Sequence, residues 1–239
     1  MKKLFILPLM LLTFLTVSLT AQSTLEKGYL KMELTEASSD NEQMAAGLEM
    51  LKGSETEYFF DKDNSLVKQS MMGGMVNITT LVDNKTEGIN MFFDMMGQKM
   101  HVETSTEEME KSAESGQADA MGEMKVTYDE SDTKEILGYK CKKANITSSG
   151  AEGFTFGLYV TEDIKASPKM IQGLQKVDLK GFPLELVIDM GQMKMVYTTT
   201  EIKKEVDPTA FKISADGYKK MSFEEFQESM GAMGGGMGF

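Results

Sequence analysis

The sequence predicts a mainly β protein, a single antiparallel sheet curved into an open or half-closed barrel with two or three short lid helices at its mouth. Short segments in which apolar and polar residues alternate recur along the chain, as is typical of strands with one buried face. Turn-forming Gly, Asn and Asp residues separate these segments at intervals of about ten residues. This spacing favours a meander of neighbouring strands over a fold in which strands and helices alternate.

The N-terminal segment is typical of a cleaved secretory signal peptide. Lys2 and Lys3 precede an apolar segment over 4–20, and the small residue Ala21 follows it. A transmembrane helix needs about 20 mostly apolar residues, whereas Pro8 and several Thr and Ser residues interrupt this segment. We therefore expect an exported protein, periplasmic or extracellular, that does not span the membrane after cleavage. The expected divisions are a signal peptide over 1–22, a single β-rich domain over 23–230 and a flexible Gly/Met-rich tail over 231–239.

The first half of the mature chain is predicted to contain six strands and one helix. Tyr29–Thr35 alternates apolar and polar residues and is the first strand. Ser39 and Glu42 form a capping box ahead of apolar residues at helical spacing, and Gly53 is placed to end the helix. Residues 106–124 are acidic and rich in Ala, Ser and Gly, so they are expected to form a solvated loop with no more than one helical turn. Five further strands are expected over 55–60, 66–71, 76–82, 89–95 and 99–104.

The second half is predicted to contain five strands and two helices. Ser167 and Pro168 begin a brief helix, with Pro at its first position. A hairpin follows, because apolar residues alternate on both sides of the turn Met190-Gly191-Gln192. Ser222 and Glu225 form a capping box before the last helix. The strands are expected over 125–128, 140–147 and 154–161 and, in the hairpin, over 184–188 and 193–197.

Three segments in this half have a distinctive sequence. Residues 136–144 read ILGYKCKKA, 159–164 read YVTEDI and 179–186 read LKGFPLEL. They resemble, in this order, the Gly-Tyr-Lys-Cys-x-Lys-Ala, aromatic-x-Thr-x-x-Ile and Gly-Leu-Pro-Gly-Leu-Ile motifs of the GLPGLI family and its sister family of exported proteins of unknown function. Phe182 and Leu184 depart from the last motif. The resemblance implies a fold similar to the outer-membrane lipoprotein carrier, an open antiparallel barrel with a helical lid over an apolar concavity, and it implies no catalytic residue.

The charge of the mature chain excludes one class of partner. Cleavage of the signal peptide removes two lysines and no acidic residue, so the formal net charge moves from −12 to −14. An acidic protein repels phosphate backbones, and nucleic acid is therefore not an expected partner.

Candidate catalytic and metal-binding groups are scarce. The chain has one histidine, His101, and one cysteine, Cys141, and neither lies in a nucleophile or zinc-binding motif. Cys141 alternates with Lys140 and Lys142 in a strand pattern, so its side chain is expected to point inward as a small, unreactive apolar group. We predict that the protein is not an enzyme and uses no cofactor, and we assign no catalytic residue, cofactor-binding residue or metal ligand.

Methionine is unusually frequent, with 23 in 239 residues and no Trp. Because Met is flexible and polarizable, a methionine-lined concavity adapts to varied apolar guests such as acyl chains. Thioether sulfur is also a soft ligand for Cu(I) or Ag(I), and the closely spaced Met193 and Met195, or Met230, Met233 and Met237, fit such a site. His101 would be available as a further donor. The alternation that places Met193, Met195 and Tyr197 on one face of a strand favours the apolar lining.

These observations predict an exported, non-catalytic binding protein that holds a lipid, an acyl group or another apolar partner in the concave face of the sheet. The partner is expected to be an apolar small molecule or a lipidated or envelope protein. The alternatives are an envelope structural or interaction protein without a ligand, and a Met-rich Cu(I)- or Ag(I)-binding protein. The residues expected to form the apolar lining are Met91, Met100, Tyr159, Met170, Leu174, Phe182, Leu186, Met193, Met195 and Tyr197.

Overall fold

The computed structural model describes residues 24–115, 122–150 and 155–232. Twelve strands of this part of the chain form one sheet. The predicted signal peptide and residues 233–239 of the predicted tail lie outside the described residues. The strands are β1 (Gly28–Ser39), β2 (Glu55–Phe60), β3 (Asn64–Met71), β4 (Val76–Asp83), β5 (Gly88–Met95), β6 (Gln98–Ser105), β7 (Met124–Ile136), β8 (Tyr139–Ser148), β9 (Thr155–Thr161), β10 (Phe182–Asp189), β11 (Met193–Lys203) and β12 (Lys219–Met221).

The order of the strands across the sheet is β12-β6-β5-β4-β3-β2-β1-β11-β10-β9-β8-β7. Every neighbouring pair is antiparallel except β12, which runs parallel to β6. The predicted fold class, a mainly β protein with one open sheet and short helices, is therefore confirmed. The helices are α1 (Glu42–Leu51), α2 (Thr106–Ser115) and α3 (Phe223–Ala232), with 3-10 turns over Met72–Gly74, Pro168–Met170 and Pro208–Phe211.

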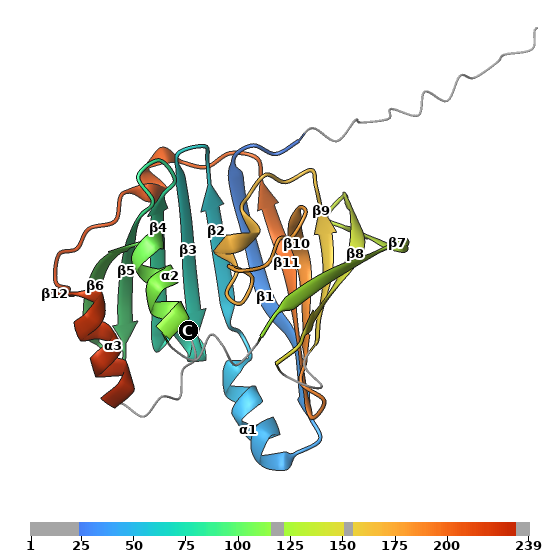
Figure 1. Ribbon diagram of the computed structural model, residues 1–239, viewed down its shortest axis with the longest axis horizontal. Helices are drawn as coiled ribbons and strands as arrows, with labels where there is room; N and C mark the ends of the chain where they lie inside the picture. Colours follow the sequence, from blue (N-terminus) through green and yellow to red (C-terminus); the bar gives the residue numbers. More distant parts are fainter. Residues whose placement is uncertain (1–23, 116–121, 151–154, 233–239) are drawn as a thin grey trace, which may run out of the picture.

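The sheet curls so that one of its faces is concave (Figure 1). On one half of this face, Met109 of α2 and Phe226 of α3 pack against buried residues of β4, β5 and β6. On the other half, the segment 162–181 folds back onto the sheet and buries Ile171 and Leu174 against it. Both halves of the concave face are therefore partly covered by segments of the chain itself.

The buried residues form three clusters. The main core joins apolar side chains of β1, β2 and β7–β10 to the segment 162–181. It contains Cys141, which is fully buried as predicted, and burial raises the pKa of its thiol to about 12. The α1 cluster joins Leu48 of α1 to Leu34 and Met195. The methionine cluster lies on β4–β6 under α2 and α3, and its methionines are Met71, Met72, Met91, Met95, Met100, Met109 and Met221.

The first helix begins later than its predicted capping box implies. Asn41, not Ser39, is the N-cap residue, and its Oδ1 accepts hydrogen bonds from the backbone N–H groups of Gln43 and Met44 at 2.9 and 3.3 Å. Ser39 is the last residue of β1, and its hydroxyl donates to the carbonyl of Gln192 at 2.7 Å. Asn and Ser cap helices about equally well. The helix therefore begins after Asn41 because Ser39 is part of β1.

The predicted loop over 106–124 is wrong for its first ten residues, which form α2. Glu107 and Glu108 lie in the first turn, where the helix dipole favours negative charge. Lys111 forms an ion pair with Glu107 at 2.6 Å across one turn. Met109 also packs against the methionine cluster. These local and tertiary contacts stabilise a helix in a stretch whose composition alone predicts a solvated loop.

The capping box at the start of α3 is confirmed. Ser222 Oγ accepts a hydrogen bond from the Glu225 N–H at 3.1 Å, and a carboxylate oxygen of Glu225 accepts one from the Ser222 N–H at 2.8 Å. The ring of Phe226 then stacks on Phe93 of β5, with centroids 4.4 Å apart. The strand β12, just before α3, has no counterpart among the predicted strands and is held by its parallel pairing with β6.

Other elements also differ in length from their predictions. β7 extends over Met124–Ile136, well beyond the predicted 125–128, because a bulge between Asp129 and Thr133 lets the strand continue along β8. The helix predicted at Ser167 and Pro168 is a single 3-10 turn, in which the Ser167 hydroxyl accepts from the Lys169 N–H.

Candidate functional site

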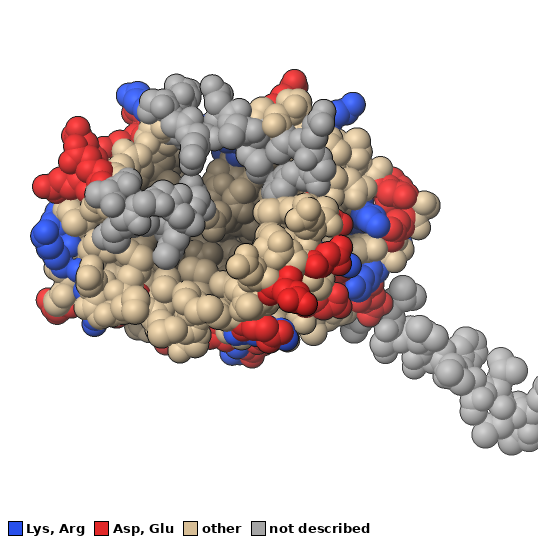
Figure 2. All heavy atoms as spheres, turned by 90° about the horizontal axis from the view of Figure 1, so that it is seen from below, with Lys and Arg blue, Asp and Glu red and all other residues tan. Residues whose placement is uncertain are grey.

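The concave side of the sheet is the candidate site. Seen from below, the molecule is hollowed at its centre, and uncharged residues form most of the visible wall of the hollow (Figure 2). Charged side chains lie mainly toward the outside in the same view. A recess of this kind suits a guest that is largely apolar.

Two rows of paired residues cross the concave face of β2–β6. Residues directly opposite each other in an antiparallel pair point to the same face of the sheet, so a series of such pairs forms a row across that face. The two rows contact the main core at one end and the methionine cluster at the other. Neither row contains an Asp, Glu, Lys or Arg residue. The rows are Tyr58–Val67–Thr80–Met91–Val102 and Thr56–Gln69–Ile78–Phe93–Met100.

The part of these rows between the two clusters is polar and neutral. Thr56, Gln69 and Thr80 are half-buried there. Burial raises the pKa of the Tyr58 phenol far above the ordinary value, so that the ring stays uncharged. Sequence patterns contain no indication of this neutral stripe, because polar residues in a strand normally indicate a solvent-facing side chain.

The ten residues predicted to line the concavity do not lie in one place. The structure puts Leu174, Phe182 and Leu186 inside the main core, with Met170 beside it. Met91 and Met100 belong to the methionine cluster. Met195 is buried in the α1 cluster, with Met193 and Tyr197 packed against it. Several of these side chains therefore fill space themselves, and Leu174 and Phe182 have no exposed surface.

Tyr159 faces away from the hollow. Its neighbours Leu158 and Val160 are buried in the main core, and successive side chains of a strand point to opposite faces. The Tyr159 hydroxyl donates to Asp132 at 3.0 Å, and the ammonium group of Lys143 lies 5.8 Å from the centre of its ring. Tyr159 therefore has charged neighbours in addition to its packing against the edge of the main core, and its place in an apolar lining stays a prediction.

Exposed methionine side chains lie at the open end of the hollow. Five of the six exposed large apolar side chains in the described residues are methionines, and Met96 is the most exposed at 82%. They lie on α1 and on the turns of the β3–β4, β5–β6 and β10–β11 hairpins, at the lower end of the sheet (Figure 1). We call this set the methionine rim, and it consists of Met44, Met50, Met75, Met96 and Met190.

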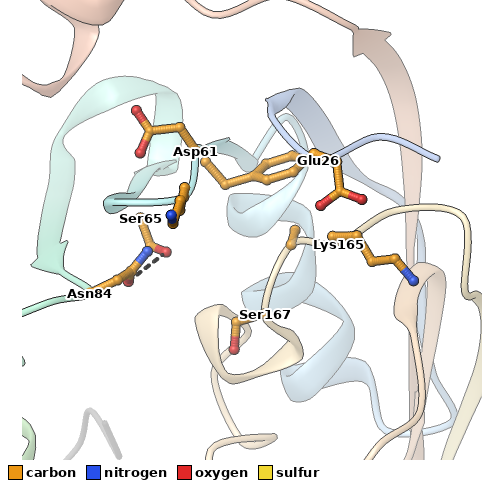
Figure 3. A pocket seen from close by; sticks show the side chains of 9 residues that line it. Glu26, Asp61, Ser65, Asn84, Lys165 and Ser167 are labelled. Carbon is orange, nitrogen blue, oxygen red and sulfur yellow. Dashed lines mark hydrogen bonds between the residues drawn. The ribbon is translucent and has the colours of Figure 1, made fainter.

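A second recess of about 380 Å³ lies at the opposite end of β3 (Figure 3). Glu26, Asp61, Lys62 and Lys165 contribute charged groups to its wall, and Ser65 donates a hydrogen bond to Asn84 at 3.1 Å. The charged groups in its wall make this recess less suited to an apolar guest than the hollow. Its complete lining is Glu26, Phe60, Asp61, Lys62, Ser65, Asn84, Lys165, Ala166 and Ser167.

The histidine considered as a soft-metal donor lies apart from the methionines of its own hairpin. His101 pairs with Phe92 across β5 and β6, and the two rings stack with centroids 4.4 Å apart. Its Nε2 lies 2.9 Å from Oδ1 of Asn90. Met100 lies on the opposite face of the same strand, in the methionine cluster. In the part of the chain that the structure describes, no three His, Cys, Asp or Glu residues are grouped as metal ligands.

Thr199 offers a test of packing beside the hollow. It pairs with Met32 on β1 and is 2% exposed, and its hydroxyl has no hydrogen-bond partner among the described residues. A buried unpaired hydroxyl costs about 1–3 kcal/mol relative to an apolar group of the same shape. We expect Thr199→Val to raise the free energy of unfolding by about 1 kcal/mol in urea denaturation. Thr200→Val, at the exposed neighbour, should change it by less than about 0.5 kcal/mol; a loss of stability in Thr199→Val alone would contradict this account.

No helix within 24–115, 122–150 or 155–232 is long and apolar enough to cross a membrane. No protein-family model matches the chain, and no curated protein matches it. The resemblance to the GLPGLI family therefore stays a prediction.

The solved structures that the comparison found share little sequence with this chain. The lipoprotein LppX of Mycobacterium tuberculosis is 9% identical, with a TM-score of 0.36, and the match covers 77% of this chain and 89% of LppX. LprF of Mycobacterium bovis is 14% identical, with a TM-score of 0.31 and coverage of 78% and 90%. A chain of the Pseudomonas aeruginosa MucA/MucB complex is 7% identical, with a TM-score of 0.35, and the match spans 80% of this chain but only 57% of that one. Because these TM-scores are all below 0.5, the likenesses carry no conclusion about this chain.

Proposed function

We propose that this protein is an exported, non-catalytic binding protein that holds a lipid, an acyl group or another largely apolar partner on the concave face of its sheet. The observation that carries the proposal is the hollow, crossed by two rows of residues without a charged side chain. Transfer of an acyl chain from water to such a surface is favourable by about 0.8 kcal/mol for each buried CH₂ group.

Two further features support this proposal. The hollow lies between two apolar clusters, one of which contains seven methionines, and methionine side chains adapt their shape to different guests. The methionine rim gives the open end of the hollow exposed apolar side chains, which an apolar guest can contact as it enters.

The test places a charge inside the hollow and the same charge outside it. Thr80 lies on the concave face, whereas Thr79 pairs with Lys68 and Phe92 on the convex face. We expect Thr80→Arg to abolish binding of a neutral fluorescent apolar dye and Thr79→Arg to leave it unchanged, because an unpaired buried charge is strongly unfavourable. Circular dichroism checks that both variants keep the fold.

Native mass spectrometry of the protein purified after export from its host supplies the second readout. We expect a co-purifying apolar molecule that is absent from the Thr80→Arg variant. If the wild type carries no such molecule and also fails to bind the dye, the concavity holds no ligand, and the alternative of an envelope structural or interaction protein is favoured.

A further inference from the structure

We infer that the hollow recognises an uncharged hydrogen-bonding group, such as an ester, amide or hydroxyl, within an otherwise apolar ligand. This inference rests on the proposed function and names the ligand class for the same site. It comes from the neutral polar stripe, which consists of Thr56, Gln69 and Thr80 and separates the main core from the methionine cluster.

The register of the sheet brings the three side chains together. Thr56 on β2 lies directly opposite Gln69 on β3, and Gln69 lies directly opposite Ile78 on β4. Thr80 is two residues beyond Ile78 on the same face, diagonal to Gln69. Diagonal neighbours on one face have Cα atoms about 7–8 Å apart, within reach of a long side chain. One polar group of a ligand is therefore able to contact Gln69 together with either threonine.

Gln69 has hydrogen-bonding capacity to spare. A Gln amide supplies two N–H donors and one carbonyl acceptor, and the side chain of Gln69 makes no hydrogen bond within the described residues. It is half-buried, so a ligand that covers it would remove it from water. A covered polar group without a partner costs free energy, whereas a ligand group that accepts or donates there avoids this cost.

The chemistry of the stripe also excludes charged groups. The two central rows supply no Lys or Arg to pair with a carboxylate or phosphate and no Asp or Glu to pair with an ammonium group. A charged ligand group on this surface would lose its hydration and would find no opposite charge to replace it, which costs free energy. The net charge of −12 for the whole chain further disfavours anions. A neutral head or linking group is therefore preferred.

The closing experiment compares two ligands with the same acyl chain, palmitate and monopalmitoylglycerol, by their displacement of the neutral apolar dye at about pH 8, where palmitate is ionised. For the wild type we expect monopalmitoylglycerol to bind about tenfold more tightly than palmitate. In Gln69→Leu/Thr80→Val the affinity for monopalmitoylglycerol should fall about tenfold, as the loss of one or two hydrogen bonds predicts. The affinity for the dye should stay within about twofold, which also reports that the variant is folded.

Thr79→Val is the matched control, because it makes the same chemical change on the convex face, and it should leave all three affinities unchanged. The single variants Gln69→Leu and Thr80→Val should each show part of the loss. If the dye binds but palmitate competes as well as monopalmitoylglycerol, or if the double variant keeps the wild-type ratio, the inference is overturned while the proposed function stands. If neither the dye nor either lipid binds the wild type, both are overturned.

Discussion

Gly181→Ala is expected to lower the free energy of unfolding by roughly 3 kcal/mol or more. Gly181 has φ +92°, a left-handed conformation that side chains disfavour. A Cβ atom at this position would also lie 2.5 Å from the carbonyl oxygen and 2.8 Å from the carbonyl carbon of Thr161. These are backbone atoms, so relief of the contact requires that the chain itself move.

The position explains why such a shift is costly. Gly181 ends the segment 162–181 and directly precedes β10, whose first residue Phe182 pairs with Thr161 of β9. Separating Gly181 from Thr161 would therefore disturb the first pairing of β9 with β10. This position is also the glycine that the predicted GLPGLI-like stretch shares with the family motif.

Gly191→Ala is the matched control. Gly191 has φ +75° in the β10–β11 turn, but a Cβ atom at this position would have no neighbouring heavy atom within 4 Å. The substitution carries only the cost of placing a side chain in the left-handed conformation, about 1–2 kcal/mol. Urea denaturation followed by far-ultraviolet circular dichroism measures both changes. Equal losses in the two variants would show that the contact with Thr161 contributes nothing.

Phe182→Ala is expected to cost about 3–5 kcal/mol, the range observed when a buried aromatic ring is removed from a protein core. The Phe182 side chain is fully buried in the main core and meets the ring of Tyr58 edge to face, with centroids 5.6 Å apart. Total stabilities of domains are about 5–15 kcal/mol, so this single change removes a large share. The residue joins β10 to β2, strands that do not neighbour each other in the sheet.

Phe59→Ala provides the comparison. Phe59 is half-buried, and its ring packs on Tyr29 with centroids 4.9 Å apart, under the ammonium group of Lys68. We expect a loss of about 1 kcal/mol there. The urea midpoint and slope for each variant separate a loss of stability from a change in compactness. A loss at Phe182 no larger than that at Phe59 would mean that the main core tolerates the cavity by collapse.

Much of the local structure follows from the sequence alone. The strand predicted over 55–60 has the bounds of β2, and the capping box of Ser222 and Glu225 begins α3. The burial of Cys141 also agrees with its alternation with two lysines. These features depend on interactions between residues close in the chain, namely side-chain alternation, helix capping and turn formation, so a short window of sequence contains their cause.

The arrangement of the site was decided only by the tertiary structure. β1 pairs with β11, about 170 residues further along the chain, and alternation within either strand does not specify this partner. The alternation of side chains shows which residues share a strand face with Gln69 and with Thr80. It does not show whether that face is the convex face, which contacts solvent, or the concave face, which lines the hollow, because polar residues occur on both. Only the curl of the whole sheet, with the segment 162–181 on one half and α2 and α3 on the other, places the neutral stripe inside the hollow and separates the predicted lining residues into three clusters.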